Sequence, residues 1–227
     1  MTSKTQKCLV GSTEAAPTKT EAGEPDVPGR DSEEAAALEL MGGTAEWALS
    51  DGVPHVVSLK LTKSSGGTFS FSGFPYLETL AVDNLAINRL DVSQNAALAA
   101  LDCSGNSLKE LDVSKNTSLT CLEASNNELE ELDLTNNPVL KDLFVSYNRL
   151  ASLDLSGNPA LRRVDVRDNK LKKLDLSKNV GLRSLDVFHN KIAELDLSNN
   201  CELVDYHLDF DHIVRLTTPG KAAEEGE

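Results

Sequence analysis

The residues of this chain best suited to chemistry are two carboxylates and a guanidinium in its C-terminal half. Asp165 and Asp186 stand 21 residues apart, and Arg167 lies close to the first of them. Paired carboxylates cleave glycosidic bonds, so a carbohydrate-active β-helix enzyme is one interpretation. The charged face of a repeat protein supplies such clusters without catalysis, and the pattern implies no cleft. We therefore expect a protein that is not an enzyme.

A metal site is the second chemical possibility, because His189, His207 and Asp209 lie within one short region. Their places in the repeat put them apart across a strand, and no spaced His/Cys motif accompanies them. The sequence therefore predicts no metal and no other cofactor. Cys8, Cys103, Cys121 and Cys201 form no recognisable framework, and we expect free thiols.

These residues belong to a repeat that is marked by asparagine. Eleven asparagines follow one another in steps that alternate between 11 and 10 residues: Asn95, Asn106, Asn116, Asn127, Asn137, Asn148, Asn158, Asn169, Asn179, Asn190 and Asn200. The structural unit is thus a 21-residue coil made of two similar halves. A fixed period in this range indicates a solenoid, whose long exposed faces favour binding over catalysis.

Seven such units run without gaps from Phe69 to Arg215, each with an 11-residue half followed by a 10-residue half. Each half contains an L-x-L segment, which is strand-like, and then S-x-N, which is typical of a turn. Stacked coils would place the asparagines in a buried ladder that satisfies the backbone groups of the turns. We expect a mainly β protein: a parallel β-solenoid of seven coils, with strands on both faces and a cap at each end.

The pattern L-x-x-L-x-L-x-x-N-x-L, present as LKDLFVSYNRL and LRSLDVFHNKI, resembles the leucine-rich repeat. The nested second copy in each unit is similar to the irregular 21-residue class of bacterial leucine-rich repeats, and more distantly to the internalins. The resemblance implies parallel β-coils, recognition of proteins or glycans, and no catalytic residues. It also favours a secreted or cell-surface location, although the chain itself has no apolar segment typical of a signal peptide.

The two ends depart from the repeat. Residues 1–31 are rich in Thr, Glu, Pro and Gly and are expected to form a disordered arm. Residues 32–68 are expected to form an N-terminal cap with a short helix over 32–41 and a β-hairpin that turns near Asp51. Residues 69–215 are the solenoid, and residues 216–227 are expected to be a disordered acidic tail.

Composition limits the partners. The formal net charge of −14 argues against nucleic acid and anionic membrane surfaces, which call for basic patches. No apolar run approaches the ~20 residues of a membrane span, so membrane insertion is not expected. We expect a monomer whose partner is a protein or a glycan.

The two faces of the solenoid differ in variability. The outward positions of the 11-residue halves are almost all Asp and Ser, and we expect each Asp to accept hydrogen bonds from a neighbouring Ser, Thr or turn backbone. The 10-residue halves vary, and their candidate partner-binding residues are Phe144, Tyr147, Arg163, Asp165, Arg167, Asp186, Phe188, His189 and His207.

Exposed aromatics and arginine are enriched at binding hot spots, so we interpret the chain as a non-catalytic binding module. Two alternatives stay open. Arg163 could pair with Asp142, and Arg167 with Asp165 or Asp186, in purely structural contacts. The chain could also be a surface or adhesin spacer with no dedicated site.

Overall fold

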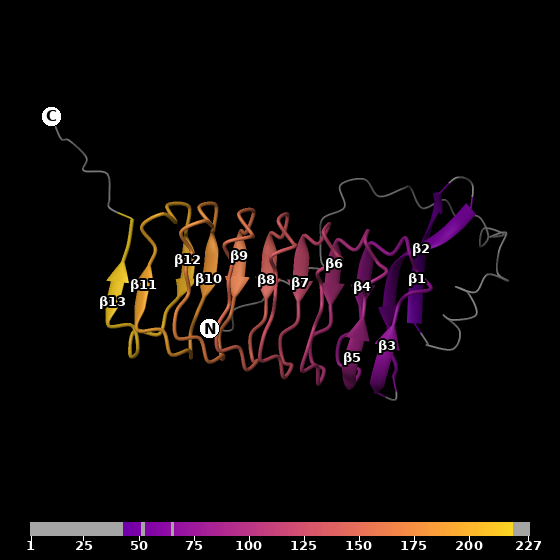
Figure 1. Ribbon diagram of the computed structural model, residues 1–227, viewed down its shortest axis with the longest axis horizontal. Helices are drawn as coiled ribbons and strands as arrows, with labels where there is room; N and C mark the ends of the chain where they lie inside the picture. The colour runs from indigo at the N-terminus through magenta and orange to yellow at the C-terminus, as the bar shows by residue number, and fades with distance from the viewer. Residues whose placement is uncertain (1–42, 51–52, 65, 220–227) are drawn as a thin grey trace, which may run out of the picture.

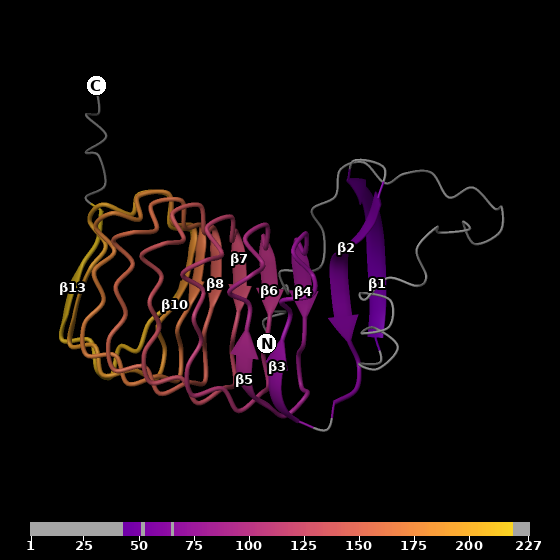
Figure 2. The same cartoon turned by 45° about the vertical axis from the view of Figure 1, so that its right-hand side comes forward.

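The computed structural model describes residues 43–50, 53–64 and 66–219, which form a parallel β-solenoid (Figures 1 and 2). The expected fold class is confirmed, and no helix occurs among the described residues. The arm over 1–31 and the short helix expected over 32–41 lie outside the described residues. The described segment extends past Arg215, because β13 (Arg215–Thr217) includes two residues that we expected in the tail.

One long sheet runs the length of the solenoid in the order β1-β2-β4-β6-β7-β8-β9-β10-β12 (Figure 1). Its strands are β1 (Gly43–Ser50), β2 (Val53–Leu61), β4 (Thr79–Ala81), β6 (Ala100–Asp102), β7 (Cys121–Glu123), β8 (Asp142–Phe144), β9 (Arg163–Asp165), β10 (Ser184–Asp186) and β12 (Asp205–His207). β1 and β2 are antiparallel, and every later pair is parallel. The register advances by one whole coil at each step, as in the pairing of Leu122 with Leu143. The 10-residue halves therefore build this sheet.

The opposite face, built by the 11-residue halves, is less regular. It carries only two short parallel pairs, β3 (Gly67–Ser70) with β5 (Ile87–Asp91) and β11 (Glu194–Asp196) with β13. Between these pairs the described chain is extended but forms no strand ladder, which differs from the expectation of strands along both faces.

The reason for this difference is that turns occupy most of each 11-residue half. In the coil that begins at Leu111, Asn116 donates its N–H to the Val113 carbonyl, and Leu119 donates to the Asn116 carbonyl. Two successive turns leave little chain for a ladder. The inward leucines on this face, such as Leu111 and Leu132, stay 7% and 8% exposed, whereas Leu122 on the long sheet is 0% exposed. The coils are thus less tightly closed on the 11-residue side.

All eleven repeat asparagines are buried, but they bond in two different ways. In the 10-residue halves the side chain both accepts and donates. The Asn148 Oδ1 accepts the Leu129 N–H at 3.0 Å, and its Nδ2 donates to the carbonyls of Ala124 and Val145 at 3.0 and 3.1 Å. Two of these three groups belong to the preceding coil, so the amide connects neighbouring coils.

In the 11-residue halves the asparagine acts as a donor only. The Asn137 Nδ2 donates to the carbonyls of Val113 and Asn116 at 3.1 and 2.9 Å. Its Oδ1 is buried without a hydrogen-bond partner, and the same holds for Asn95, Asn116, Asn158, Asn179 and Asn200. The two halves therefore use one residue type for two different tasks.

The two kinds of asparagine predict different costs of substitution. Asn148→Ala leaves the buried Leu129 N–H unbonded, at about 1–3 kcal/mol, and removes one of the two amide donors to each of the Ala124 and Val145 carbonyls, so it should be the most destabilising change. Asn137→Ala leaves no N–H unbonded, because the Val113 and Asn116 carbonyls keep their backbone donors, and it also removes an unpartnered oxygen, so it should cost less. The control is Asn126→Gly, because Asn126 is exposed with a φ of 57° and glycine adopts that conformation freely. Urea unfolding of the three variants measures the order, and equal midpoints for Asn148→Ala and Asn126→Gly would contradict it.

Candidate functional site

The candidate binding residues all lie on or beside the long sheet, but two of them, Phe144 and Asp165, are buried. Phe144, expected as an exposed aromatic, is only 6% exposed. The guanidinium of Arg163 lies over its ring, 5.5 Å from the centroid. Arg163 is held there by Asp142, through Nε–Oδ1 and NH2–Oδ2 contacts of 2.6 and 2.9 Å. The structural alternative is therefore correct for Arg163, and the interpretation of Phe144 as an exposed anchor is wrong.

Arg167 lies between the two carboxylates that raised the question of catalysis. Its Nε is 3.5 Å from Asp165 Oδ2, and its NH1 is 3.8 Å from Asp186 Oδ2. Asp165 is 7% exposed, and burial raises its pKa to about 6 against the opposing effect of the Arg167 charge. Asp186 also accepts the Phe188 N–H at 3.1 Å. These groups form a partly neutralised ionic cluster on the sheet.

Beside this cluster runs a column of residues with left-handed backbone. The position just before the repeat asparagine has a positive φ in successive coils, from Asn84 and Gly105 through Asn126 to Tyr147, Asp168 and His189. Gly and Asn adopt this conformation readily, whereas a bulky side chain there is uncommon. Tyr147, at φ 54°, therefore occupies a position that favours Gly or Asn, whereas His189, at φ 53°, is a residue type that is enriched in this conformation.

The side chains of this column and its neighbour form a continuous surface, which we call the aromatic patch: Tyr147, Arg167, Phe188 and His189. Arg167 lies over the Tyr147 ring at 5.5 Å, and the Phe188 and His189 rings stack with centroids 4.1 Å apart. Tyr147 and Phe188 are 48% and 41% exposed. Two coils thus present rings to solvent at the edge of the sheet, and the coil between them contributes Arg167.

His207 lies at the border of the patch on β12, with Nδ1 3.5 Å from Asp186 Oδ2. Asp168 was not among the candidate residues, but its Oδ1 is 2.9 Å from His189 Nδ1 and holds that ring in place. The 21-residue period could have predicted this contact, since a residue stacks on its equivalent 21 positions away and Asp168 is the equivalent of His189. The same rule pairs Asp142 with Arg163.

The cysteines differ from the expectation of free thiols at one position. Cys103 is free and buried, and burial raises the pKa of its thiol. Cys201 is free and exposed. Cys121, on β7, is disulfide-bonded, so the prediction of a free thiol there is wrong. Cys8 lies outside the described residues.

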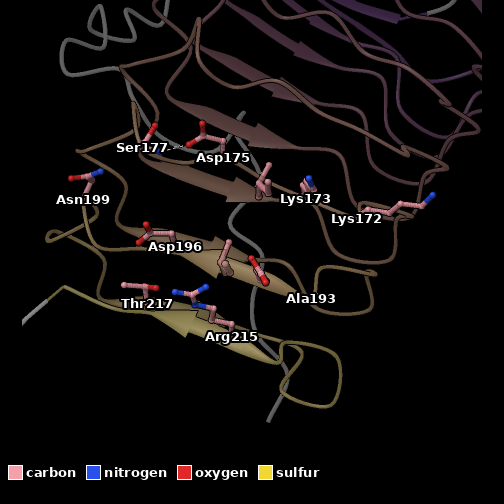
Figure 3. A pocket seen from close by; sticks show the side chains of 12 residues that line it. Lys172, Lys173, Asp175, Ser177, Ala193, Asp196, Asn199, Arg215 and Thr217 are labelled. Atoms are coloured by element: carbon pink, nitrogen blue, oxygen red, sulfur yellow. Dashed lines mark hydrogen bonds between the residues drawn. The ribbon is translucent and has the colours of Figure 1, made fainter.

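Two grooves lie on the opposite face, between neighbouring 11-residue halves. The larger, of about 760 Å³, is lined by Lys172, Lys173, Asp175, Asp196 and Arg215 among others (Figure 3). A second, of about 470 Å³, repeats the arrangement between Lys109–Asp112 and Glu130–Asp133. Both open where the strand ladder is missing, so we interpret them as gaps between coils.

The acidic row beside these grooves is held by local hydrogen bonds, as expected from the sequence. Asp133 Oδ1 accepts the Thr135 N–H at 2.9 Å and the Thr135 hydroxyl at 2.7 Å, and Asp154 accepts the Ser156 N–H at 2.9 Å. These bonds lower the pKa of both carboxyls. The row is therefore firmly ionised and offers neither a proton donor nor an aromatic anchor.

The described residues contain neither a metal-binding cluster nor a membrane-spanning helix. No group of three or more His, Cys, Asp or Glu side chains in that part of the chain is arranged to hold a metal ion. Residues 43–50, 53–64 and 66–219 also contain no helix that is long and apolar enough to span a bilayer.

No protein-family model matches this sequence, and no curated protein does. Several solved structures are similar to this chain. The functional domain of InlJ from Listeria monocytogenes has a TM-score of 0.60 and 28% identity, over 66% of this chain and 41% of that chain. The internalin InlF from L. monocytogenes has a TM-score of 0.55 and 18% identity, over 66% of this chain and 45% of that chain. A leucine-rich-repeat protein of Leptospira interrogans has a TM-score of 0.56 and 21% identity, over 61% of this chain and 38% of that chain. The chain thus matches less than half the length of each.

The buried Asp165 predicts a stability that depends on pH. A carboxyl whose pKa is raised on folding stabilises the folded state least when it is ionised, so its contribution falls as pH rises from about 4 to about 6. Asp165→Asn keeps an acceptor for the Arg167 N–H and should raise the free energy of unfolding by about 1–3 kcal/mol at pH 7.5. The gain should vanish below about pH 4, where the carboxyl is protonated in both states.

Urea unfolding at several pH values measures this effect. The matched control is Asp133→Asn on the opposite face, where the pKa is lowered and the sign is reversed. That variant should lose stability at pH 7.5 and keep it at low pH. A stability loss at pH 7.5 in Asp165→Asn would show that the bond with Arg167 outweighs the cost of burying the charge.

Proposed function

Because the protein has a leucine-rich-repeat fold of the bacterial, internalin-like kind, we propose that it is a non-catalytic module that binds a protein through the aromatic patch. Solenoids of this type bury one continuous core and present an extended surface to partners. The fold makes binding the general expectation, and the choice of surface comes from the side chains of this chain.

The observation that carries the proposal is the left-handed backbone under Tyr147. A non-glycine residue in this region costs about 1–2 kcal/mol, less for Asn than for other side chains. The same column holds Asn84, Gly105 and Asn126 in earlier coils, where the conformation is easily met. Stability alone would favour Asn or Gly in the later coils too. Bulky rings at strained positions are a feature of functional surfaces.

Exposure supports the same surface. Tyr147 and Phe188 each leave more than two fifths of their surface in water, and His189 has a side-chain exposure of 60%. Exposed rings contribute little to a free protein and much to a complex that removes them from water. Arg167, over the Tyr147 ring, adds a donor that suits acceptor groups of a partner. Tyr and Arg are enriched at the hot spots of protein–protein interfaces, so we take a protein as the partner.

The ionic cluster beneath the patch favours a structural role for its carboxylates. Asp165 and Asp186 both contact Arg167, which neutralises part of their charge. Neither groove reaches them, because both grooves lie on the opposite face. A hydrolase needs a free acid and a free nucleophile or base beside a substrate cleft. We therefore infer that the cluster orients Arg167 for binding and that the module is not an enzyme.

The test separates binding from stability. Tyr147→Asn relieves the left-handed strain but loses the Arg167 contact, worth about 0.5–1 kcal/mol at an exposed site. The free energy of unfolding should therefore not fall. A variant that combines Tyr147→Asn with Phe188→Ser should nevertheless weaken binding at least tenfold, or by about 1.4 kcal/mol or more. Ligands are found by probing protein and glycan arrays with the biotinylated protein, and affinities are measured by biolayer interferometry.

The control is Asp133→Ala combined with Asp154→Ala, on the face with the grooves. A protein ligand that is lost with the first pair and kept with the second supports the proposal. The reverse result places the site on the wrong face. If the only ligand found is a glycan, the proposed class of partner is wrong. If neither array yields a ligand, the result favours a spacer without a dedicated site.

A further inference from the structure

The C-terminal end of the solenoid exposes apolar side chains that the repeat elsewhere buries. Tyr206 occupies an inward position of the repeat, equivalent to the fully buried Leu143 and Leu185, yet it is 50% exposed. Phe210 is 67% exposed, and Val204 and Val214 are 82% and 87% exposed. Apolar groups gathered at one end of a soluble protein usually mark an interaction surface.

The backbone at this end is also unpaired. β12 is the last strand of the long sheet, and no strand of the described chain pairs with its outer side. Asp205 donates its N–H to the Arg183 carbonyl, and the His207 carbonyl accepts the Val187 N–H. Because alternate residues of a strand direct their backbone groups to opposite neighbours, the N–H and C=O of Tyr206 point outward.

The coil below shows what such an edge normally binds. Val166 donates its N–H upward to the carbonyl of Asp186 in the following strand, at 2.9 Å. Leu208 occupies the same repeat position as Val166, two coils later, so its N–H points to the open edge of β12. The end therefore offers donors, an acceptor and an apolar surface in the arrangement that receives a further strand.

We propose that the occupant is a second copy of this chain, related by a two-fold axis through the outer edge of β12. Antiparallel pairing centred on Tyr206 makes Tyr206 the partner of its own equivalent, so that each N–H bonds the other carbonyl. Asp205 of one copy then lies opposite His207 of the other, twice. The Asp205 carboxylate can accept an N–H of the opposed His207 ring, so the strand Asp205-Tyr206-His207 is complementary to itself in side-chain as well as backbone hydrogen bonding.

The two-fold arrangement is preferred because it produces a closed dimer and leaves no β12 edge unpaired. Stacking this end on the β1 end of another copy would leave an open edge at each end and produce filaments. The two-fold pair joins two long sheets into one and covers Tyr206. It differs from the monomer expected from the sequence. It does not rest on the proposed function, because the aromatic patch lies outside the paired edge.

The charges of β12 allow a swap experiment on the full chain. Sedimentation equilibrium of the wild type should show a monomer–dimer equilibrium. Asp205→Lys replaces the acceptor opposite His207 with a cation, and His207→Glu places two carboxylates opposite each other, so each variant alone should dimerise about tenfold more weakly. An equimolar mixture of the two variants should recover the dimer, because the mixed pair places the new lysine opposite the new glutamate and keeps the original Asp205–His207 pair at the other position.

The control is Asp133→Lys, which changes charge equally on the opposite face and away from the end. It should leave the dimer unchanged, and circular dichroism confirms folding of every variant. A wild type that stays monomeric, growth into filaments, or two swapped variants that fail to recover the dimer on mixing would each overturn the proposal. So would a dimer that forms only after removal of residues 220–227, since that segment would then cover the edge itself.

Discussion

The stack depends on amide side chains that bond to backbone groups inside the turns. Each turn leaves N–H and C=O groups facing the interior, where water cannot reach them, and leaving them unbonded is costly. Asn148 reaches Leu129 and Ala124 of the preceding coil. A coil is therefore fully satisfied only when the next one is in place. This coupling, added to the apolar core, makes neighbouring coils fold as a unit.

The inequality of the two halves explains the difference between the faces. In the 10-residue half the turn takes up few residues, so the extended part pairs with the next coil in a strand ladder. The 11-residue half spends most of its length on two turns. Its coils stay slightly open, its leucines are a little more exposed, and grooves appear between them. The same asymmetry leaves the regular, closely spaced face for the aromatic patch.

The period alone allowed the fold and the direction of most side chains to be predicted, because residues 21 positions apart stack on each other. It could not predict what covers an outward side chain. Phe144 points away from the core, yet Arg163 of the next coil lies over it. Nor could it predict the strain at Tyr147, because the asparagines and glycine of the same column hide the unusual backbone. The disulfide at Cys121 and the missing ladder depend on geometry that no periodic pattern carries.

The different hydrogen bonding of the asparagines in the two halves also restricts how such a chain can lengthen in evolution. A turn whose amide must accept and donate cannot stack in register with one whose amide only donates. An internal duplication of 10 or 11 residues would place unlike turns on each other and strand a buried N–H at the junction. A duplication of 21 residues preserves every bond. The heritable unit is therefore the whole coil, and coil number can vary among descendants while the order of the halves cannot.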